Sequence, residues 1–378
     1  MPKTVFDINI DFKKSKGSYV FDKKTNKYFL DLFSMFSSLP LGYNHQIFDT
    51  TFDQKIKYIS HLRMSNNLFQ STEFENFEKK FLKISFHNNL HFCSTGALAV
   101  ESALKCAYEY KKDPEAIVLG VKNSFHGINS WGFVTDSEIS SVKNRVLNYP
   151  KNNWELHSLD LLIEELEKNT KNICSVIIEP IQCTSGDVYL DTVKLRNIQK
   201  LCNKNDICFI IDEIQTGFGV TGEMWYSQMI GLNPDVIVFG KKSQICGIMT
   251  NDKYSEAILS KYRKLEVTFD GDLIDAVRAE YIIDAIEKYS LLDNVKKKSD
   301  ILHNELSGLF DNYRSIGHLI AFDFKSKQAR DAFVNDAYFS GLLVNPTNDR
   351  SIRIRPNLAF SNNELDELLV KINKIKGK

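Results

Sequence analysis

The middle of the chain alternates between short apolar runs and longer segments with helical periodicity. The apolar runs cover residues 91–93, 116–119, 176–178, 208–211 and 236–239. Helical segments lie between several of them, near residues 97–111, 158–168 and 192–204. Strands made of apolar residues are buried on both faces, so this alternation predicts an α/β fold with a mainly parallel sheet flanked by helices. Ligands of such sheets bind beyond the carboxyl ends of the strands.

The last hundred residues have a different pattern, which predicts a smaller α+β domain. A long helix is expected near residues 273–289, with short strands near 319–324 and 351–355 and a final helix after the capping box Ser361-x-x-Glu364. A hairpin over residues 18–32 is expected to join this domain. The predicted division is an N-terminal segment at 1–45, a large domain at 46–275 and a small domain at 276–378.

A further helix is predicted ahead of the alternating region. Thr72-x-x-Glu75 has the spacing of a capping box, which marks a helix start. Phe74, Phe77 and Phe81 recur at helical spacing and are expected on one face of that helix.

Composition argues against several classes of partner. Lysine plus arginine and aspartate plus glutamate each number 48, so the net charge is zero, and neither nucleic acid nor a membrane surface is expected as a ligand. No apolar run approaches the length of a membrane span, and the first residues lack a secretory h-region. The seven cysteines contain no C-x-x-C pair, which suits reduced thiols and a cytoplasmic location.

Two patterns look functional but fit their motifs poorly. His87 and His91 stand four residues apart, yet His91 enters a predicted strand and no third ligand is near, so no metal site is expected. Gly217-Phe-Gly-Val-Thr-Gly222 matches the dinucleotide-binding pattern G-x-G-x-x-G. In that fold the glycines join a strand directly to a helix, whereas here Asp-Glu-Ile-Gln-Thr intervenes and no helix start follows. A dehydrogenase is therefore disfavoured.

Polar groups follow several of the predicted strands. In Cys93-Ser-Thr-Gly-Ala-Leu-Ala99 a strand passes into a helix, whose first N–H groups and dipole suit a phosphate. The alternative is a plain N-cap formed by Ser94 or Thr95. In Asn123-Ser-Phe-His-Gly127 the phenylalanine is suited to stacking on a planar ring, and the alternative is a packed phenylalanine beside a surface histidine.

Charged groups follow two other strands. Asp212 ends the run 208–211, where a carboxylate needs a partner, either a salt bridge or a protonated ring nitrogen. Lys241 and Lys242 follow Gly240 after the run 236–239, either as a polar loop or as a chemical group. An anion cradle, a stacking aromatic, a carboxylate and a lysine at the ends of one sheet are what pyridoxal phosphate requires.

These residues resemble a known family. Asp212-Glu-Ile-Gln-Thr-Gly-Phe-Gly219, followed by Pro234-Asp235 and Gly240-Lys241, is similar to the signature of class III aminotransferases, which are fold-type I pyridoxal phosphate transferases. The segments LDLFSMFSSLPLGYN, GALAVESALK, SFHG, EPIQ and FGKKSQICGIM resemble, in order, those of lysine 6-aminotransferases. The resemblance covers nearly the whole chain. It implies a PLP-dependent transaminase that moves an amino group from a lysine-like terminal amine to a 2-oxo acid such as 2-oxoglutarate.

The resemblance also implies roles for single residues. Lys241 would form the Schiff base with the cofactor, and Lys242 would point elsewhere. Asp212 would keep the pyridine nitrogen protonated, and Gln215 would lie near the phenolic oxygen. Phe125, beside His126, would stack on the ring.

The phosphate would be held by two chains. Thr95, Gly96 and Ala97 of one subunit would bind it, and Thr268 would reach it from the second subunit. The resemblance therefore implies a homodimer with shared active sites.

Two positions depart from the lysine 6-aminotransferase pattern. Ile128 stands where those enzymes have an arginine that grips a substrate carboxylate, and isoleucine cannot replace a bidentate arginine. Thr184 stands where they have a glutamate that pairs with a C-terminal arginine, which is retained here as Arg355. An amine without a free α-carboxylate is therefore an alternative donor, and Trp131 is a candidate for lining its site.

Other activities remain open on the same fold. An aminomutase or a racemase would use the same cofactor and return a product that keeps its nitrogen. A non-catalytic relative is disfavoured because it would need neither Lys241 nor Asp212.

Overall fold

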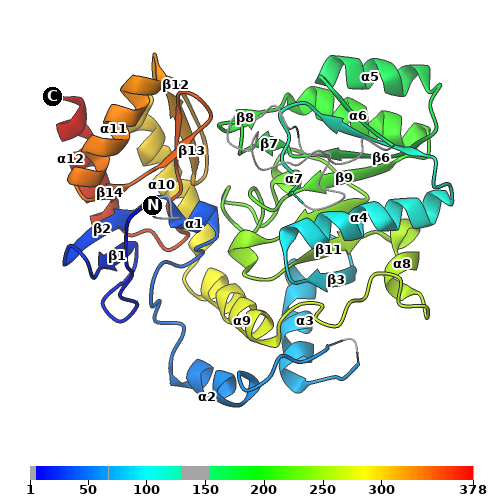
Figure 1. The fold of residues 1–378 in the computed structure, drawn as a ribbon, viewed down its shortest axis with the longest axis horizontal. Coiled ribbons are helices and arrows are strands. Elements are labelled where there is room, and N and C mark those ends of the chain that lie inside the picture. Colours follow the sequence, from blue (N-terminus) through cyan, green and yellow to red (C-terminus); the bar gives the residue numbers. More distant parts are fainter. Residues whose placement is uncertain (1–5, 67, 129–135, 137–152, 378) are drawn as a thin grey trace. The chain divides into compact units, whose positions relative to one another are not determined.

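The computed structural model describes residues 6–66, 68–128, 136 and 153–377. The chain divides into two compact units. The large unit comprises Phe52–Phe218 and Glu223–Asp284, and the small unit comprises Met1–Thr51, Gly219–Gly222 and Ala285–Lys378. Figure 1 labels their helices and strands.

The large unit is built on a seven-stranded sheet with the order β3-β11-β10-β9-β6-β4-β5. Its strands are β3 (Asn89–Cys93), β4 (Ile117–Val121), β5 (Trp154–His157), β6 (Ile173–Ile178), β9 (Cys208–Asp212), β10 (Val236–Phe239) and β11 (Cys246–Thr250). Neighbouring strands from β10 to β5 pair in parallel, whereas β11 is antiparallel to β10 and β3. The predicted mainly parallel sheet is confirmed, although β5 and β11 were not predicted.

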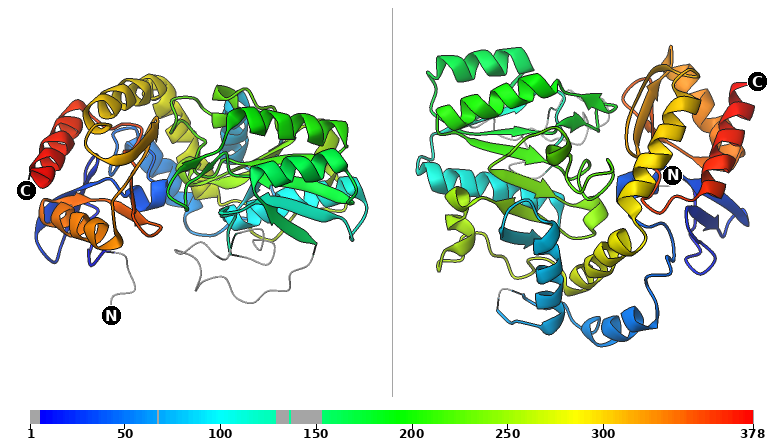
Figure 2. Two further views of the ribbon diagram at one scale, coloured as in Figure 1. Left: turned by 90° about the horizontal axis from the view of Figure 1, so that it is seen from above. Right: turned by 180° about the vertical axis from the view of Figure 1, so that it is seen from behind.

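Helices cover both faces of this sheet, as Figures 1 and 2 show. The main ones are α4 (Gly96–Lys111), α5 (Leu159–Lys168) and α6 (Thr192–Lys204). Val118 and Ile177 pack into the core on the α4 side, whereas their neighbours Leu119 and Val176 pack on the side of α5 and α6. Successive side chains of a strand point to opposite faces, so strands covered on both sides must be apolar throughout.

An aromatic cluster joins α3 (Thr72–Ile84) to the antiparallel edge of the sheet. The rings of Phe77 and Phe81 are buried and lie 4.9 and 5.4 Å from that of Phe92 on β3. The predicted shared face of this helix is therefore confirmed. The predicted cap is wrong by one residue, because Ser71 rather than Thr72 accepts the hydrogen bond from the Phe74 N–H.

The small unit contains two sheets and three long helices. The strands are β1 (Tyr19–Asp22), β2 (Lys27–Asp31), β12 (Asp311–Ile316), β13 (Leu319–Asp323), β14 (Leu342–Leu343), β15 (Asn345–Thr347) and β16 (Ser351–Ile354). The helices are α1 (Ser34–Ser37), α10 (Leu291–Leu306), α11 (Lys327–Phe339) and α12 (Asn362–Lys376). The hairpin β1–β2 pairs with β14, so the N-terminal segment folds with the C-terminal one. Ser361 and Glu364 form the predicted capping box of α12.

The remaining elements are short or link the two units along the chain. They are α2 (Thr50–Ile59), β7 (Ile181–Gln182), β8 (Val188–Tyr189), α7 (Tyr226–Met229), α8 (Glu256–Leu259), α9 (Leu273–Lys288) and the 3₁₀ turns η2 (Lys241–Ser243) and η3 (Asp252–Tyr254). Among the residues placed in the structure, no helix combines the length and apolarity needed to cross a bilayer.

Candidate active site

Asp212 lies at the carboxyl end of β9 and is only 4% exposed. Its Oδ2 is 2.8 Å from Nδ1 of His126, and its Oδ1 accepts a hydrogen bond of 3.0 Å from the Ile214 N–H. His126 is itself 1% exposed, so the alternative of a surface histidine is wrong. The buried carboxylate is thus held by a ring and by its own backbone turn, which fixes its orientation.

The segment Ser124–Gly127 brings two predicted motifs together. The N–H of Phe125 donates to Oε1 of Glu179 at 2.6 Å. Gly127 has φ +108°, and a Cβ there would lie 2.9 Å from the Cβ of Ala97. This turn therefore sits against the start of α4, and glycine is required for both its conformation and its close approach.

The start of α4 has the geometry predicted for an anion cradle. Thr95 is the N-cap, and its hydroxyl accepts from the Leu98 N–H at 3.3 Å, which confirms the predicted N-cap. The first turn of any helix still presents N–H groups that have no intrahelical partner. A Cβ on Gly96 would lie 2.9 Å from Cδ1 of Ile214, two residues after Asp212. The start of α4 therefore packs against the turn that follows Asp212.

Glu179 is a site residue that the sequence reasoning missed. It follows β6 directly and is buried. Burial raises the pKa of its carboxyl well above the usual range, the negative charge of Asp212 raises it further, and Lys241 opposes the shift. These three ionisable groups therefore lie within electrostatic reach of one another. The signal was available, because Glu179 follows an apolar run in the same way as Asp212.

The two adjacent lysines have different environments. Lys241 opens η2 in a left-handed conformation with φ +52°, and its carbonyl accepts from the Gln244 N–H at 2.9 Å. Its side chain is partly exposed, whereas Lys242 is only 1% exposed. Lys241 also influences the titration of Glu179, which places its charge on the side of the carboxyl groups.

Three other predicted site residues of the large unit are at least partly exposed. Gln215 lies in the turn after β9 and Thr184 in the turn between β7 and β8, and both are partly exposed. The Thr184 turn contacts the Asn123 turn, because Ser185 Oγ donates to the Asn123 carbonyl at 2.7 Å. Ile128 is 38% exposed.

Two further predicted residues are not brought to Asp212 by any described contact. Thr268 is exposed on the loop that precedes α9. Trp131 lies outside the described residues. The structure therefore leaves both of their predicted roles as predictions.

Arg355 belongs to the small unit and is 1% exposed. Its Nη1 donates to the carbonyls of Ile320 and Ile354, both at 3.2 Å. Its own carbonyl accepts from Ser34 Oγ at 2.5 Å. These contacts hold the arginine firmly within its unit, and its predicted role toward substrate stays a prediction.

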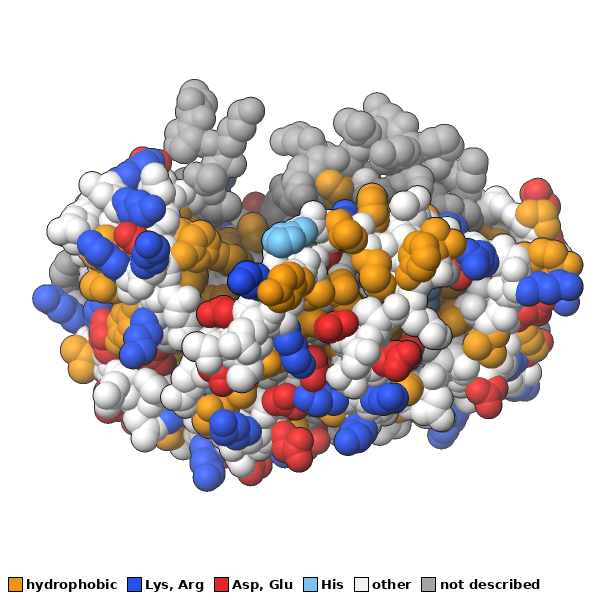
Figure 3. Space-filling view, turned by 90° about the horizontal axis from the view of Figure 1, so that it is seen from below, with side chains coloured by type: hydrophobic (Ala, Val, Ile, Leu, Met, Phe, Trp, Pro, Cys, Tyr) orange, Lys and Arg blue, Asp and Glu red, His pale blue; other side chains and the backbone are white. Residues whose placement is uncertain are grey.

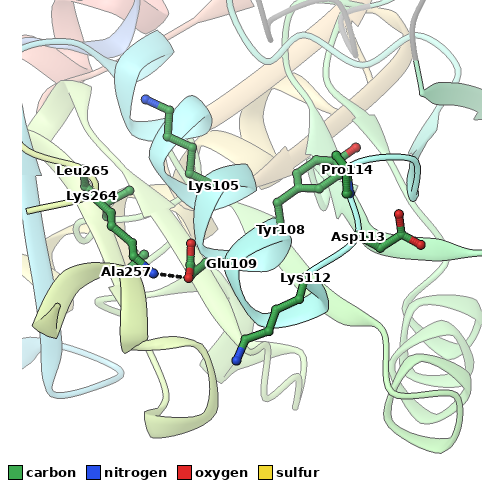
Figure 4. A pocket seen from close by; sticks show the side chains of 9 residues that line it. All are labelled: Lys105, Tyr108, Glu109, Lys112, Asp113, Pro114, Ala257, Lys264 and Leu265. Carbon is green, nitrogen blue, oxygen red and sulfur yellow. Dashed lines mark hydrogen bonds and ion pairs between the residues drawn. The ribbon is translucent and has the colours of Figure 1, made fainter. Parts of the chain in front are cut away.

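A separate cavity of about 660 Å³ lies at the far end of α4. Figure 4 shows its lining, in which Lys264 and Glu109 form an ion pair. The cavity is bordered by Lys112, the left-handed cap of α4, and contains none of the predicted site residues. The lining begins at Lys105, nine residues after Gly96, so the cavity starts about 14 Å along the helix from the cradle.

The donor set at the strand ends fits pyridoxal phosphate. The cradle at Gly96 has free helical N–H groups for a phosphate, and Asp212 offers a carboxylate to a protonated ring nitrogen. Phe125 and Lys241 complete the requirement with an aromatic face and an amine. The contacts of Gly96 with Ile214 and of Asp212 with His126 bring these groups into one region.

Comparisons with known proteins identify the family. A family model described as aminotransferase class-III matches residues 1–375. The L-lysine-epsilon aminotransferase of Amycolatopsis lactamdurans is 30% identical over 409 residues, covering 96% of this chain and 90% of that protein. The enzyme of the same name from Streptomyces clavuligerus is 30% identical, covering 96% and 89%. A lysine aminotransferase structure from M. tuberculosis, in the internal aldimine form, is 26% identical with TM-score 0.91, covering 99% and 96%.

Proposed function

The chain belongs to the class III aminotransferases, and from that membership we propose that it transfers an amino group from a lysine-like terminal amine to a 2-oxo acid such as 2-oxoglutarate. It is a pyridoxal phosphate-dependent transaminase of α/β fold type I, as predicted from the sequence. The donor is proposed because the 30% identical relatives are L-lysine-epsilon aminotransferases. The observation that carries the proposal is that the consecutive residues Phe125 and His126 contact Glu179 and Asp212, which brings two buried carboxyl groups together at the strand ends.

We assign each group a role from its position. When bound, pyridoxal phosphate supplies a protonated ring that withdraws electrons from the substrate carbon. Asp212 pairs with the ring nitrogen, and His126 holds that carboxylate in place. Lys241 would hold the cofactor through its Nζ, and the same amine would be the general base for the proton on the substrate carbon.

The remaining proposed contacts orient the cofactor. Phe125 would cover one face of the ring, and Gln215 would lie toward its phenolic oxygen. Thr95, Gly96 and Ala97 bind the phosphate through the first turn of α4.

Two residues bear on the identity of the amine donor. Ile128 offers no charge to a substrate carboxylate, and Thr184 cannot pair with Arg355 as a glutamate would. These two residues support an amine without a free α-carboxylate as the second candidate. An aminomutase or racemase would use the same groups, and only its product, which keeps the nitrogen, would differ.

We further propose a homodimer of two-domain subunits. Large apolar side chains are exposed at the end of α2, before α3 and near α8, which is unusual for a free surface. They are Tyr58, Leu62, Leu68, Phe69, Leu259, Tyr262, Val267 and Phe269. Figure 3 shows one face of the molecule, on which hydrophobic side chains lie interspersed with charged ones. Thr268 lies among these residues, which supports its delivery to a second subunit.

The domain division and the location stay as predicted from the sequence. We propose domains at residues 46–275 and 276–378, with residues 1–45 joining the second, in a cytoplasmic enzyme. Its partners are then small molecules and a second copy of the chain, without nucleic acid or membrane.

The visible absorption spectrum of the purified protein with pyridoxal phosphate, before and after L-lysine, tests the proposed function. A yellow band that bleaches with lysine supports both the cofactor site and the donor. A yellow band that ignores lysine overturns the donor, and a panel of amines without an α-carboxylate then follows. Analysis of the product distinguishes a transaminase, which removes the nitrogen, from an aminomutase or racemase, which keeps it.

A further inference from the structure

Arg63 reaches the residue that precedes the phosphate cradle. Its Nη2 donates to Oγ of Ser94 at 2.9 Å, and Ser94 comes directly before Thr95, the N-cap of α4. The arginine lies on the segment between α2 and α3, far from the cradle in sequence. A positive charge is thus brought to the end of the helix that already favours an anion.

The same arginine also contacts the loop that carries Thr268. Its Nε lies 3.3 Å from Oδ2 of Asp272, and its Cζ lies 4.6 Å from the centre of the Phe269 ring. Ser94 Oγ passes its own hydrogen to the Phe269 carbonyl at 2.5 Å. One guanidinium therefore ties the cradle to the loop through hydrogen bonds, an ion pair and a cation–π contact.

The arrangement places the Arg63 guanidinium beside the cradle, with the carboxyl groups of Asp272 and Asp275 as its acidic neighbours. Asp272 offsets part of the charge of Arg63, but its carboxylate also caps α9 by accepting from the Ile274 N–H at 2.8 Å. The side chains of Arg63 and Asp272 are 44% and 23% exposed, so solvent screens their pairing. A phosphate monoester carries about −1.5 to −2 charge near neutral pH, which this cluster would stabilise.

We propose that Arg63 is a positioning residue for the cofactor phosphate, holding Ser94 and the Thr268 loop in place while adding positive charge at the cradle. The proposal rests on the proposed function, because it assumes that pyridoxal phosphate binds at the start of α4. Its consequence is specific to the phosphate. Arg63 should matter for pyridoxal phosphate and hardly at all for pyridoxal, which presents the same ring and aldehyde.

The test measures binding of each compound to the full-length chain after removal of its cofactor. Apparent Kd values for pyridoxal phosphate and pyridoxal are taken from the visible absorption band for Arg63→Gln, Arg63→Lys and Ser94→Ala. Arg196→Gln is the control, because it removes the same charge from exposed α6. We expect Arg63→Gln to weaken pyridoxal phosphate about ten-fold, as for an exposed, partly screened charge. Arg63→Lys should stay within about three-fold.

Arg63→Gln and Ser94→Ala can also be combined in one chain, which tests whether the two residues are energetically coupled. Ser94→Ala should weaken pyridoxal phosphate, and it should cost less in the Arg63→Gln background, because the two variants share the Arg63–Ser94 hydrogen bond whereas only Ser94→Ala removes the bond to the Phe269 carbonyl. Equal losses for the two compounds, unchanged affinity in Arg63→Gln, or an Arg63→Lys variant as weak as Arg63→Gln would overturn the proposal. If Arg63→Gln does not fold, Ser94→Ala carries the same comparison. Failure of the unmodified chain to bind pyridoxal phosphate would instead contradict the proposed function.

Discussion

His126 and Asp212 form a buried pair in which the imidazole Nδ1 lies 2.8 Å from a carboxylate oxygen, across 86 residues of sequence. Replacing His126 by leucine removes one of the donors that hold Asp212. We expect a loss of about 1–3 kcal/mol in stability, because a buried carboxylate loses a partner. We also expect turnover to fall about ten-fold, which corresponds to about 1.4 kcal/mol of weaker charge stabilisation.

Steady-state kinetics and thermal unfolding of two variants check this expectation. His126→Asn places an amide near the position of Nδ1 and should recover part of both losses, whereas His126→Leu should not. The kcat should change more than KM, since the pair acts on the ring rather than on the substrate. Equal kinetics in the two variants would show that the pair is merely structural.

A second prediction separates the two lysines. Lys241→Ala should abolish the yellow colour of the protein with pyridoxal phosphate and lower activity at least about 10³-fold, because no other amine takes its place. Lys242→Ala should keep the colour but lose about 1–3 kcal/mol of stability, since removing its buried stem leaves a cavity.

Absorption spectra and unfolding curves of both variants decide between these assignments. Lys242→Met, which keeps most of the stem, serves as the milder control and should be more stable than Lys242→Ala. If Lys241→Ala stays yellow and Lys242→Ala turns colourless, the assignment of the reactive lysine is wrong.

Sequence patterns predicted the parts of the fold that repeat a simple period. Strand β10 matches its expected residues because all four are apolar, and helix α6 matches because its buried residues Leu195, Ile198 and Cys202 recur at helical spacing. Strands β5 and β11 were missed, since Trp154–His157 mixes polar residues and Cys246–Thr250 starts beside a turn and contains glycine. Edge and antiparallel strands carry a weaker apolar signal than the buried parallel ones.

Within the site, the missed features depend on contacts distant in sequence. The burial of Lys242 and the pairing of His126 with Asp212 arise from residues that the fold brings together, so no local pattern marks them. The N-cap of α3 was predicted at Thr72 instead of Ser71, because serine and threonine are both good N-caps and stand side by side here. Asp212 was identified because a carboxylate directly after a buried strand is rare enough to be informative.

A third prediction concerns the glycine before Lys241. Gly240 has φ 173°, an extended conformation that any residue adopts, yet a Cβ there would lie 2.9 Å from Sγ of Cys246. Gly240→Ala should therefore cost about 1–3 kcal/mol through overpacking. Because the clash is with one sulfur atom, Cys246→Ala in the same chain should restore at least half of the loss.

Denaturant unfolding of the two single variants and the double variant forms a closed cycle. The interaction energy should favour the double variant by about 1 kcal/mol or more. Strictly additive losses would mean that backbone conformation, rather than contact with the sulfur, requires glycine at this position.

The last prediction concerns pH. Burial, with a smaller contribution from Glu266, raises the pKa of Asp270 to about 6, although its carboxylate accepts from the Val267 N–H at 2.7 Å. The folded state then holds this proton more tightly than the unfolded chain, so stability falls as pH rises from about 4 to about 6. Asp270→Asn keeps an acceptor and should gain about 1 kcal/mol above pH 6, a figure reduced for solvent screening, and nothing near pH 4.

Thermal unfolding across pH tests the sign directly, with Asp206→Asn as a control of opposite sign. The hydrogen bond to Lys253 lowers the pKa of Asp206, so its stabilisation is present above the unfolded pKa and is lost as pH falls. Its replacement should therefore destabilise the protein at neutral pH and become neutral in acid. A gain for Asp270→Asn that is the same at pH 4 and pH 7 would show that packing, rather than the buried charge, limits the stability of the loop that carries Thr268.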